Sequence, residues 1–314
     1  MKILINDGIH PTGKKLLEEA GYEVETDKIA QEDLPTRLNE FDAICVRSAT
    51  KVRKELIDQC PNLKAICRGG VGMDNIDVDY ARSKDIHVIN TPAASSRSVA
   101  ELVFGHLFSL ARFLHLSNRE MPSDGHTKFK NLKKNYAAGV ELTGRTLGIV
   151  GFGRIGQETA SIALGIGMNV IAVDPYMDEA EVSFGPTSHS VKVSIKTSSM
   201  DEMLSQADAI SLHVPFLGEP ILGQSEFAKM KDGVLIANAS RGGTIDEDAL
   251  LSAMESGKVA AAGLDVFVGE PEPREDLLNH SKISVTPHIG ASTGEAQEKI
   301  GIELAEKLIA ALSK

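Results

Sequence analysis

The segment Thr146–Ala160, TLGIVGFGRIGQETA, decides the fold of this 314-residue chain. Its first five residues form a short apolar run of β type, and three glycines follow at once in GxGxxG spacing: Gly151, Gly153 and Gly156. A helical pattern begins inside the motif. Such glycines permit a tight turn and let the backbone approach a pyrophosphate, whose charge the helix N-terminus holds. Taken alone, the motif is equally typical of a plain βα turn, so its context has to decide.

The context is an acidic residue at the end of the next strand pattern. Val170–Val173 is a second apolar run, and Asp174 follows it at about the 20-residue distance of the dinucleotide fingerprint. A carboxylate there accepts hydrogen bonds from ribose hydroxyls and repels a 2′-phosphate. The sequence therefore predicts a dinucleotide site that prefers NAD to NADP. Its turn comprises Gly151, Gly153, Arg154, Ile155 and Gly156.

Short apolar runs alternate with helical stretches along almost the whole chain, which is typical of βαβ units and parallel sheets. Two long helical patterns, Ser98–Leu116 and Gly294–Leu312, are interpreted as connectors between domains, with the last helix returning to the first domain. We expect two doubly wound α/β domains with parallel sheets. One is discontinuous, from residues 1–97 and 289–314, and the other spans residues 98–288 and binds NAD.

Two segments fit this alternation less well. Ser117–Tyr136 is polar and rich in lysine, which predicts a surface excursion with its lysines in a solvated loop. Met177–Thr197 has little periodicity and predicts a loop with one short extra strand.

Composition excludes several classes of partner. A formal net charge of −11 argues against nucleic acid and against a polybasic membrane surface. No apolar run reaches the roughly 18 residues of a membrane span, and the first residues, MKILINDG, are typical of a buried strand, unlike a signal peptide. The three cysteines lack CxxC spacing, which suits a reducing cytoplasm and indicates no metal site. We expect a cytoplasmic protein.

Three polar side chains follow later strand patterns, at the edge where open α/β sheets bind ligands: Arg241, Glu270 and His288. Histidine can accept a hydroxyl proton and return it, because its ordinary pKa is near neutrality. A carboxylate can orient the ring, and a guanidinium can hold a substrate carboxylate bidentately. Singly, each residue is explained as well by a cap, a loop charge or an ion pair. Together, downstream of a dinucleotide motif, they favour hydride transfer from a hydroxyl-bearing carbon.

The ordered motifs GFGRIG, HVP, NASRGG, GLDVF and TPHIGAS resemble the NAD-dependent D-2-hydroxyacid dehydrogenases over essentially the whole chain. The resemblance implies a flavodoxin-like substrate domain, an inserted Rossmann NAD-binding domain and a homodimer. It implies that Arg241 holds substrate and that Glu270 and His288 form the acid/base pair. It also implies further cofactor contacts from His213, Pro215, Ala239, Asp265 and Gly290.

Two turns of the first domain are candidates for substrate recognition. Arg47 and Ser48 end the strand pattern Ala43–Val46. A glycine-rich turn follows another strand pattern, and backbone N–H groups in such a turn can cup a carboxylate. That turn contributes Arg68, Gly70, Val71 and Gly72. Because Arg241 and this turn already serve one carboxylate, Arg47 and Ser48 suggest a substrate with a second anionic group.

The stretches VRSATKV, GVGMDNID and GASTGEAQ resemble the D-3-phosphoglycerate dehydrogenases of this family. This implies NAD-dependent oxidation of 3-phospho-D-glycerate to 3-phosphooxypyruvate, the first step of phosphorylated serine biosynthesis. Two departures are notable: Gly70 stands where the family usually has alanine, and we expect no room after Lys314 for the regulatory domain of longer members. The rivals are a glyoxylate or hydroxypyruvate reductase or another D-2-hydroxyacid dehydrogenase, such as a D-lactate dehydrogenase, and an NADH-sensing interaction protein.

Overall fold

The computed structural model describes residues 1–313. The chain forms two compact units, Arg97–Gly290 and Met1–Ser96 together with the segment that follows Gly290. The sequence places the corresponding divisions after residues 97 and 288. One unit contains a five-stranded sheet and the other a six-stranded sheet, and all strands of each are parallel, as expected for an α/β protein.

The first unit has a five-stranded parallel sheet with the strand order β2-β1-β3-β4-β5, which is the flavodoxin-like order. The strands are β1 (Lys2–Ile5), β2 (Glu23–Glu25), β3 (Ala43–Val46), β4 (Ala65–Arg68) and β5 (His87–Asn90). The helices are α1 (Pro11–Glu19), α2 (Leu34–Arg37), η1 (Leu38–Glu40), α3 (Lys54–Asp58), α4 (Val78–Ser83) and α12 (Gly294–Leu312). The strand order reverses between β1 and β3, so this unit has its ligand-binding switch point there.

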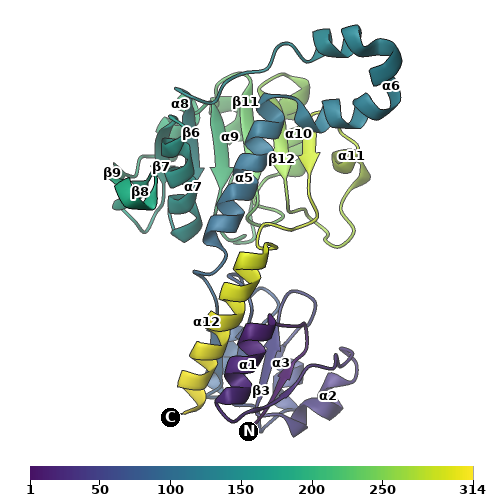
Figure 1. Ribbon diagram of the computed structural model, residues 1–314, viewed down its shortest axis with the longest axis vertical. Coiled ribbons are helices and arrows are strands. Elements are labelled where there is room, and N and C mark those ends of the chain that lie inside the picture. The colour runs from purple at the N-terminus through teal and green to yellow at the C-terminus, as the bar shows by residue number, and fades with distance from the viewer. Residues whose placement is uncertain (314) are drawn as a thin grey trace. The chain divides into compact units, whose positions relative to one another are not determined.

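Helices cover both faces of the first sheet. The terminal helix α12 packs beside α1, and Leu17 of α1 and Leu308 of α12 share one buried cluster with strand residues (Figure 1). Leu38 and Leu56 belong to the cluster on the other face. The last helix of the chain is therefore part of the first unit's core.

The second unit has a six-stranded parallel sheet with the strand order β13-β12-β11-β10-β6-β7. Its strands are β6 (Thr146–Val150), β7 (Asn169–Val173), β10 (Ala209–Leu212), β11 (Val234–Asn238), β12 (Val259–Leu264) and β13 (Ile283–Val285). Its helices are α5 (Ser96–Ala111), α6 (Leu114–Asn135), α7 (Arg154–Gly165), η2 (Thr187–His189), α8 (Met200–Gln206), α9 (Gln224–Lys229), α10 (Glu247–Glu255) and α11 (Glu275–Leu278). The order reverses between β6 and β10, directly beside the glycine motif.

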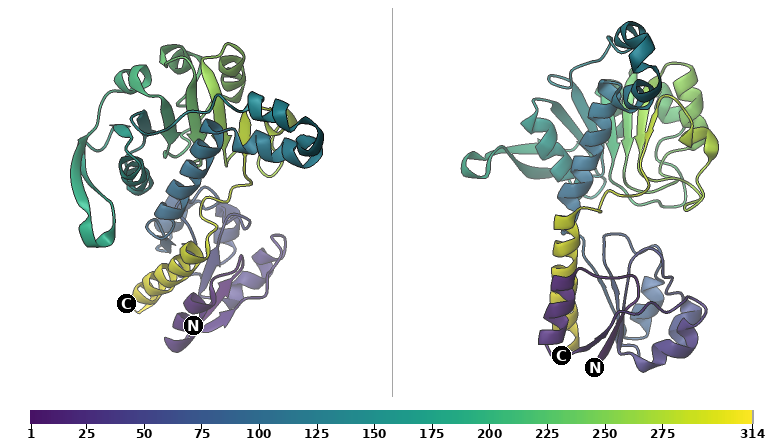
Figure 2. Two further views of the ribbon diagram at one scale, coloured as in Figure 1. Left: turned by 45° about the horizontal axis from the view of Figure 1, so that its top comes forward. Right: turned by 45° about the vertical axis from the view of Figure 1, so that its right-hand side comes forward.

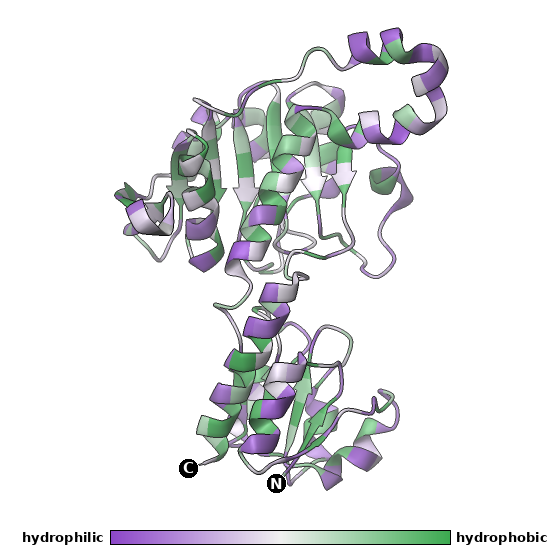
Figure 3. Cartoon of the chain, viewed as in Figure 1, coloured by the Kyte–Doolittle hydropathy of each residue, from purple (hydrophilic) through white to green (hydrophobic). Residues whose placement is uncertain are grey.

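Apolar residues of the central strands alternate between the two faces of this second sheet. Ile236 packs with residues of α8, α9 and α10, whereas the next residue, Ala237, packs with residues of α5 and α7. Figure 3 shows the same strands as the most hydrophobic part of the unit. Burial on both faces explains why these strands are nearly continuous apolar runs in the sequence.

Two predicted segments have more regular structure than the sequence indicated. The polar stretch expected to be a solvated loop is helical: α6 begins after a break at Phe113, whose φ is +54°, and consists of two helical stretches that meet at a kink at Lys128. The helix predicted over Ser98–Leu116 accordingly ends at Ala111. The expected loop with one extra strand is an antiparallel hairpin of β8 (Glu179–Phe184) and β9 (Val191–Lys196). Figure 2 shows this hairpin projecting from the sheet of the second unit.

Within residues 1–313, no single helix is both long and apolar enough to cross a membrane. The helices α5 and α6 meet the length and composition requirement only as a pair, and that pair is bent by 59°.

Candidate active site

The glycine turn lies between β6 and α7, at the reversal of the second sheet. Gly151 has a φ of +92°, and a Cβ there would lie 2.7 Å from the carbonyl oxygen of His213. Above Gly153 there is open space, and Gly153 is also the N-cap of α7, whose first turn contains no acidic residue. The turn therefore leaves room for a pyrophosphate at an uncapped helix N-terminus, so these residues fit the predicted dinucleotide.

Asp174 follows β7 and reaches back to this turn. Its Oδ2 accepts a hydrogen bond from Phe152 N at 2.7 Å, and its Oδ1 accepts one from Tyr176 N at 2.9 Å. Each carboxylate oxygen keeps a further lone pair for a ribose hydroxyl. The side chain thus holds the glycine turn in place and remains available for the role predicted from the sequence.

His213 follows β10 on the other side of the reversal. Its Nε2 lies 3.0 Å from Ser211 Oγ, and its buried Nδ1 has no hydrogen-bond partner in the structure. Burial lowers the pKa of His213 to about 3. A neutral ring with an unpartnered nitrogen at this edge fits a residue that lines the cofactor. Pro215 is exposed beside it, and Ala239 follows β11 on the same edge.

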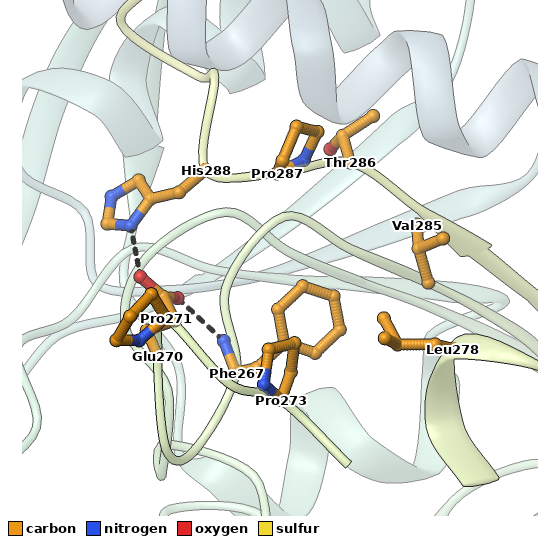
Figure 4. A pocket seen from close by; sticks show the side chains of 9 residues that line it. All are labelled: Phe267, Glu270, Pro271, Pro273, Leu278, Val285, Thr286, Pro287 and His288. Carbon is orange, nitrogen blue, oxygen red and sulfur yellow. Dashed lines mark hydrogen bonds and ion pairs between the residues drawn. The ribbon is translucent and has the colours of Figure 1, made fainter. Parts of the chain in front are cut away.

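Glu270 and His288 form a hydrogen-bonded pair, as Figure 4 shows. Glu270 Oε2 lies 2.7 Å from His288 Nδ1, and Glu270 Oε1 accepts a hydrogen bond from Phe267 N at 2.9 Å. The two side chains are 34% and 45% exposed, so the pair is accessible to a small molecule. Since a carboxylate only accepts, Nδ1 carries the proton and the lone pair of the neutral ring is on Nε2.

The charge of Glu270 is maintained by its partners. Burial raises the pKa of Glu270, but the hydrogen bonds from His288 and from Phe267 N, together with the positive charge of Arg241, outweigh this and bring the pKa below its ordinary value. Glu270 therefore stays ionised near neutrality, and it can stabilise a protonated imidazole.

Arg241 lines the same hollow as this pair. A space of about 360 Å³ is lined by Arg241, Glu270 and His288, with Phe216 and Phe267 among its apolar walls. The carbonyl oxygen of Arg241 accepts hydrogen bonds from Asn238 Nδ2 at 3.1 Å and from Thr244 Oγ1 at 2.8 Å, which fix the turn. The structure thus brings together the three residues that the sequence selected.

The same pair also borders a second, more apolar hollow of about 390 Å³ (Figure 4). Phe267, Leu278 and Val285 are among its walls. The Glu270–His288 pair is therefore polar on one side and backed by apolar side chains on the other.

Asp265, for which the family resemblance implies a contact with the cofactor, is completely buried directly after β12. Its Oδ1 accepts hydrogen bonds from Thr286 Oγ1 at 2.6 Å and Ile289 N at 2.8 Å, and its Oδ2 accepts one from Gly290 N at 2.9 Å. These contacts make Asp265 the anchor of the loop that contains His288.

The substrate candidates of the first unit lie at the carboxyl ends of β3 and β4. Ser48 is exposed, and Arg47 is half-buried beside Gly8 and Gly69. Asp7, at the end of β1, accepts hydrogen bonds from Arg47 N at 2.7 Å and Thr50 N at 3.0 Å. The segment that presents Arg47 and Ser48 is therefore held in one conformation by hydrogen bonds from its backbone N–H groups to the Asp7 carboxylate.

A second side chain supports this segment from the opposite turn. Asn75 Nδ2 donates to the carbonyl oxygens of Arg47 at 2.8 Å and Thr50 at 2.6 Å. We name Arg47–Thr50 with these supports the Arg47 loop. Neither Asp7 nor Asn75 was selected from the sequence, although Asp7 ends an apolar strand pattern and is followed by glycine, which is the available signal.

The glycine-rich turn after β4 is also fixed. Asn90 Nδ2 donates to the carbonyl oxygen of Val71 at 2.7 Å, and Thr91 N donates to that of Gly70 at 3.0 Å. Gly70 has a φ of +146°, and a Cβ there would lie 2.0 Å from Arg68 Nη1. The guanidinium of Arg68 thus occupies the space that an alanine at position 70 would need.

No group of three or more His, Cys, Asp or Glu side chains within residues 1–313 is arranged to hold a metal ion. The three cysteines in that range are buried and unpaired.

A glycine turn that fits a dinucleotide, a hydrogen-bonded Glu–His pair and a guanidinium lie at the carboxyl edge of one Rossmann sheet, an arrangement typical of NAD-dependent dehydrogenases. Comparison with known proteins agrees: residues 104–290 match the NAD-binding domain of the D-isomer specific 2-hydroxyacid dehydrogenases. The chain belongs to this family.

Several relatives are similar over nearly all of this chain. It is 43% identical to the hydroxypyruvate reductase of Thermotoga maritima, over 98% of this chain and 97% of that protein. It is 41% identical to the D-3-phosphoglycerate dehydrogenase of Methanocaldococcus jannaschii, over 98% of this chain but 57% of that longer protein. The NAD⁺-bound 3-phosphoglycerate dehydrogenase structure from Entamoeba histolytica has a TM-score of 0.79 at 27% identity, covering 100% of this chain and 96% of that one.

Proposed function

We propose that this enzyme oxidises 3-phospho-D-glycerate to 3-phosphooxypyruvate with NAD, the reaction of a D-3-phosphoglycerate dehydrogenase in serine biosynthesis. The observation that carries the proposal is the Arg47 loop, which is a preformed structure with a cationic and a hydroxyl side chain at a sheet switch point. An arginine and a serine on a rigid loop suit a phosphate dianion.

The site residues divide the chemistry between them. When bound, NAD accepts the hydride from the carbon that bears the substrate hydroxyl. His288 accepts the hydroxyl proton at Nε2, because Nδ1 is engaged by Glu270. Glu270 stabilises the imidazolium that results. Arg241 binds the substrate carboxylate and polarises the developing carbonyl, since a guanidinium matches two oxygens at once.

Ligand recognition in the first unit follows from the same reasoning. The glycine-rich turn with Gly70, Val71 and Gly72 binds the carboxylate, and Arg47 and Ser48 bind the phosphate. Arg68, whose guanidinium lies over Gly70, adds positive charge. A local cationic site admits a highly charged substrate to a protein whose formal net charge is −11.

A second candidate is the reduction of hydroxypyruvate or glyoxylate. The observation in its favour is the 43% identity to a hydroxypyruvate reductase of nearly equal length. This candidate uses the same Arg241, Glu270 and His288 but gives Arg47 no phosphate to bind.

The test is NADH oxidation with 3-phosphohydroxypyruvate, hydroxypyruvate, glyoxylate and pyruvate in parallel. We expect kcat/KM to be highest for the phosphorylated acid, by a factor of at least about 100. Arg47→Ala should raise KM for that acid and leave KM for hydroxypyruvate nearly unchanged. Arg82→Ala, which removes an exposed arginine from α4 of the same unit, is the matched control.

Equal values of kcat/KM for phosphorylated and unphosphorylated acids would replace this proposal with the reductase. An Arg47→Ala effect that is the same for both acids would contradict the phosphate assignment while leaving the dehydrogenase chemistry intact. Turnover itself separates either enzyme from an NADH-sensing interaction protein.

The homodimer and the cytoplasmic location expected from the sequence also belong to this proposal. Light scattering of the purified protein would give the mass of the assembly, and a fluorescent fusion would give the compartment.

A further inference from the structure

Helix α5 has a polar side chain on the face that packs against the sheet. Val103, Leu107 and Leu110 of this helix belong to the apolar core of the second unit, and His106, among them in sequence, is only 3% exposed. A buried polar side chain is costly unless its hydrogen bonds are satisfied. The burial of His106 among apolar side chains therefore has to be explained by its hydrogen-bond partners.

Both ring nitrogens of His106 have partners after or within β13. Nδ1 lies 3.1 Å from Ser284 Oγ, and Nε2 lies 3.0 Å from Thr286 Oγ1. Thr286 Oγ1 in turn lies 2.6 Å from Asp265 Oδ1. These contacts form a continuous chain from α5 through Thr286 to the anchor of the His288 loop.

The direction of the hydrogen bonds follows from the chemistry of each group. The carboxylate of Asp265 only accepts, so Thr286 donates its hydroxyl hydrogen to it. The Thr286 oxygen must then accept from His106, which places the ring proton on Nε2 and leaves Nδ1 to accept from Ser284. Burial lowers the pKa of His106, and the charge of Asp265 offsets this only in part, so the ring is neutral near pH 7.

The chain ends on the backbone that sets the orientation of His288. The side-chain carboxylate of Asp265 accepts hydrogen bonds from Ile289 N and Gly290 N. Its backbone carbonyl oxygen accepts another from His288 N at 2.9 Å. His288 has a φ of +53°, a conformation that a residue with a side chain adopts only when its surroundings impose it. Asp265 and its partners supply that constraint.

The sheet is shaped to receive the imidazole. Gly263, in β12, pairs with Ser284 of β13, and a Cβ at Gly263 would lie 2.4 Å from His106 Cβ and 2.6 Å from its Cγ. The absence of a side chain at Gly263 lets the ring lie against the strand. The position of His106 is therefore matched by the strand beneath it as well as by its hydrogen bonds.

We propose that His106 is a positioning residue for the proton-transfer pair: it donates to Thr286, orients the Thr286–Asp265 hydrogen bond, and thereby holds the His288 loop in its strained conformation. The inference rests on the proposed role of His288 as the acid/base. It adds a residue that touches neither substrate nor cofactor and acts only through the loop.

The experiment compares two replacements of His106. Gln places an amide N–H near the position of Nε2 and can still donate to Thr286, whereas Phe keeps the bulk and removes the donor. We expect His106→Phe to lower kcat by about 10- to 100-fold with KM changed by less than about twofold, and His106→Gln to keep kcat within about fivefold of wild type. A kcat for His106→Phe within about twofold of wild type would overturn the proposal.

A double-mutant cycle with Thr286→Val tests whether the two residues act as one unit. We expect the fold decrease in kcat of the double variant to be no more than about twice that of either single variant, because both substitutions break the same chain of hydrogen bonds. Losses that multiply would mean that His106 acts independently of Thr286, which contradicts the inference. Thr286→Ser, which keeps the hydroxyl, is the control.

A structural readout separates this inference from the function on which it rests. Failure of every 2-oxoacid as a substrate would refute the proposed function, but not the positioning contact. Hydrogen exchange measured on the backbone amides of Ile289 and Gly290 then decides: faster exchange in His106→Phe than in His106→Gln supports the contact, and equal exchange in both overturns it. Where His106→Phe is less stable overall, the exchange rates of Ile289 and Gly290 are compared relative to that of the Val285 amide in the same variant.

Discussion

Replacing Glu270 by Gln is the sharpest test of the proton-transfer pair, because it removes one charge and almost no volume. In the wild-type structure the carboxylate accepts from His288 Nδ1 and from Phe267 N. The amide can keep the second bond through its oxygen. Its NH₂ group then faces Nδ1, where it can only donate. The imidazole must therefore reverse its tautomer and carry its proton on Nε2, the atom that should accept the substrate proton.

Two effects set the magnitude. A hydrogen bond to a charged group contributes about 1.5–3 kcal/mol, and losing it at the imidazolium stage corresponds to about 10- to 150-fold in kcat. Reversal of the tautomer adds to this, and a comparable carboxylate-to-amide exchange in a Ser-His-Asp site costs about 10⁴-fold. We therefore expect kcat to fall by about 10² to 10⁴. Because the pair is more than a third exposed on the histidine side, we expect the free energy of unfolding to change by less than about 1 kcal/mol.

The assay is steady-state kinetics in both directions, with NADH fluorescence titration to obtain the Kd of the cofactor. We expect an unchanged Kd and a KM within about threefold of wild type, so that the loss falls on kcat. Glu272→Gln is the matched control, since Glu272 is exposed two residues away and uses only its backbone N–H, which donates to Gly269. The control should behave as wild type.

A fall in kcat of less than about fivefold in Glu270→Gln, with a native unfolding transition, would refute the reasoning. His288 would then work without a charged partner, and the 2.7 Å contact would be structural. An equal loss in Glu272→Gln would point instead to a general effect of the local loop.

Three further predictions concern other parts of the site. Because burial lowers the pKa of His213 to about 3, unfolding takes up a proton between roughly pH 6.5 and pH 3; stability falls as the pH falls through this window. His213→Asn should therefore reduce the slope of unfolding free energy against pH, measured with urea, by about 1.4 kcal/mol per pH unit. In Gly70→Ala the new Cβ would lie 2.0 Å from Arg68 Nη1, so the guanidinium has to move, and we expect KM to rise. Because φ at this position is +146°, the substitution should also cost about 1–3 kcal/mol of stability. Asp174→Ala removes the acceptor for Phe152 N and the charge that repels a 2′-phosphate, so the preference for NAD over NADP in kcat/KM should fall by roughly tenfold or more.

Each of these has a clear contrary result. A slope in His213→Asn equal to that of wild type would mean that the ring is already protonated in the folded protein at pH 6. A Gly70→Ala enzyme as stable and as active as wild type would mean that the turn relaxes without cost. An unchanged cofactor preference in Asp174→Ala would assign discrimination against NADP to other residues.

The strands and the glycine turn could be predicted from the sequence because their signals are local. Thr146–Val150 and Ala43–Val46 are strands with the predicted bounds, since burial on both faces makes each a short, continuous apolar run. The GxGxxG spacing requires only a turn, a close approach and a helix start, all within one short segment. Once the strands are predicted, the residues that follow them are known to lie at the carboxyl edge of the sheet. Arg241, Glu270 and His288 could be selected from the sequence for this reason.

The segments that form α6 and the β8–β9 hairpin were predicted less well, because their hydrophobic periodicity is absent or extends over only a few residues. Helix α6 has few buried residues, of which Leu132 is one, and it contains Pro122 and Gly125, so no apolar stripe marks it as a helix. The strand β9 does alternate, with Val191, Val193 and Ile195 at period two, but over only six residues, of which Ile195 alone is buried. Pairing with β8 stabilises what the segment alone does not specify.

The supporting residues could not be predicted for a different reason. Asp7, Asn75 and His106 act on groups that are 25 to 180 residues away along the chain, as in the hydrogen bonds from Asn75 to Thr50 and from His106 to Thr286. Their partners are set by the parallel sheets, which bring strand ends together irrespective of separation in sequence. A single sequence has no signal for such pairs beyond a polar residue in an apolar setting, which His106 does provide.

The support given to the Arg47 loop bears on which acid this enzyme prefers. Hydrogen bonds to a charged group contribute about 1.5–3 kcal/mol each, so two donors, Arg47 and Ser48, would favour a phosphate over a hydroxyl by about 3–6 kcal/mol, or about 10² to 10⁴ in kcat/KM. That discrimination is available only if the loop does not have to be ordered on binding, because ordering a segment of four residues would consume a comparable free energy. Asp7 and Asn75 bond the loop backbone before substrate arrives. Asn75→Ala should therefore lower the preference for 3-phosphohydroxypyruvate over hydroxypyruvate while leaving kcat for hydroxypyruvate unchanged. Loss of activity on both acids alike would show that the loop serves the fold, and not the choice of substrate.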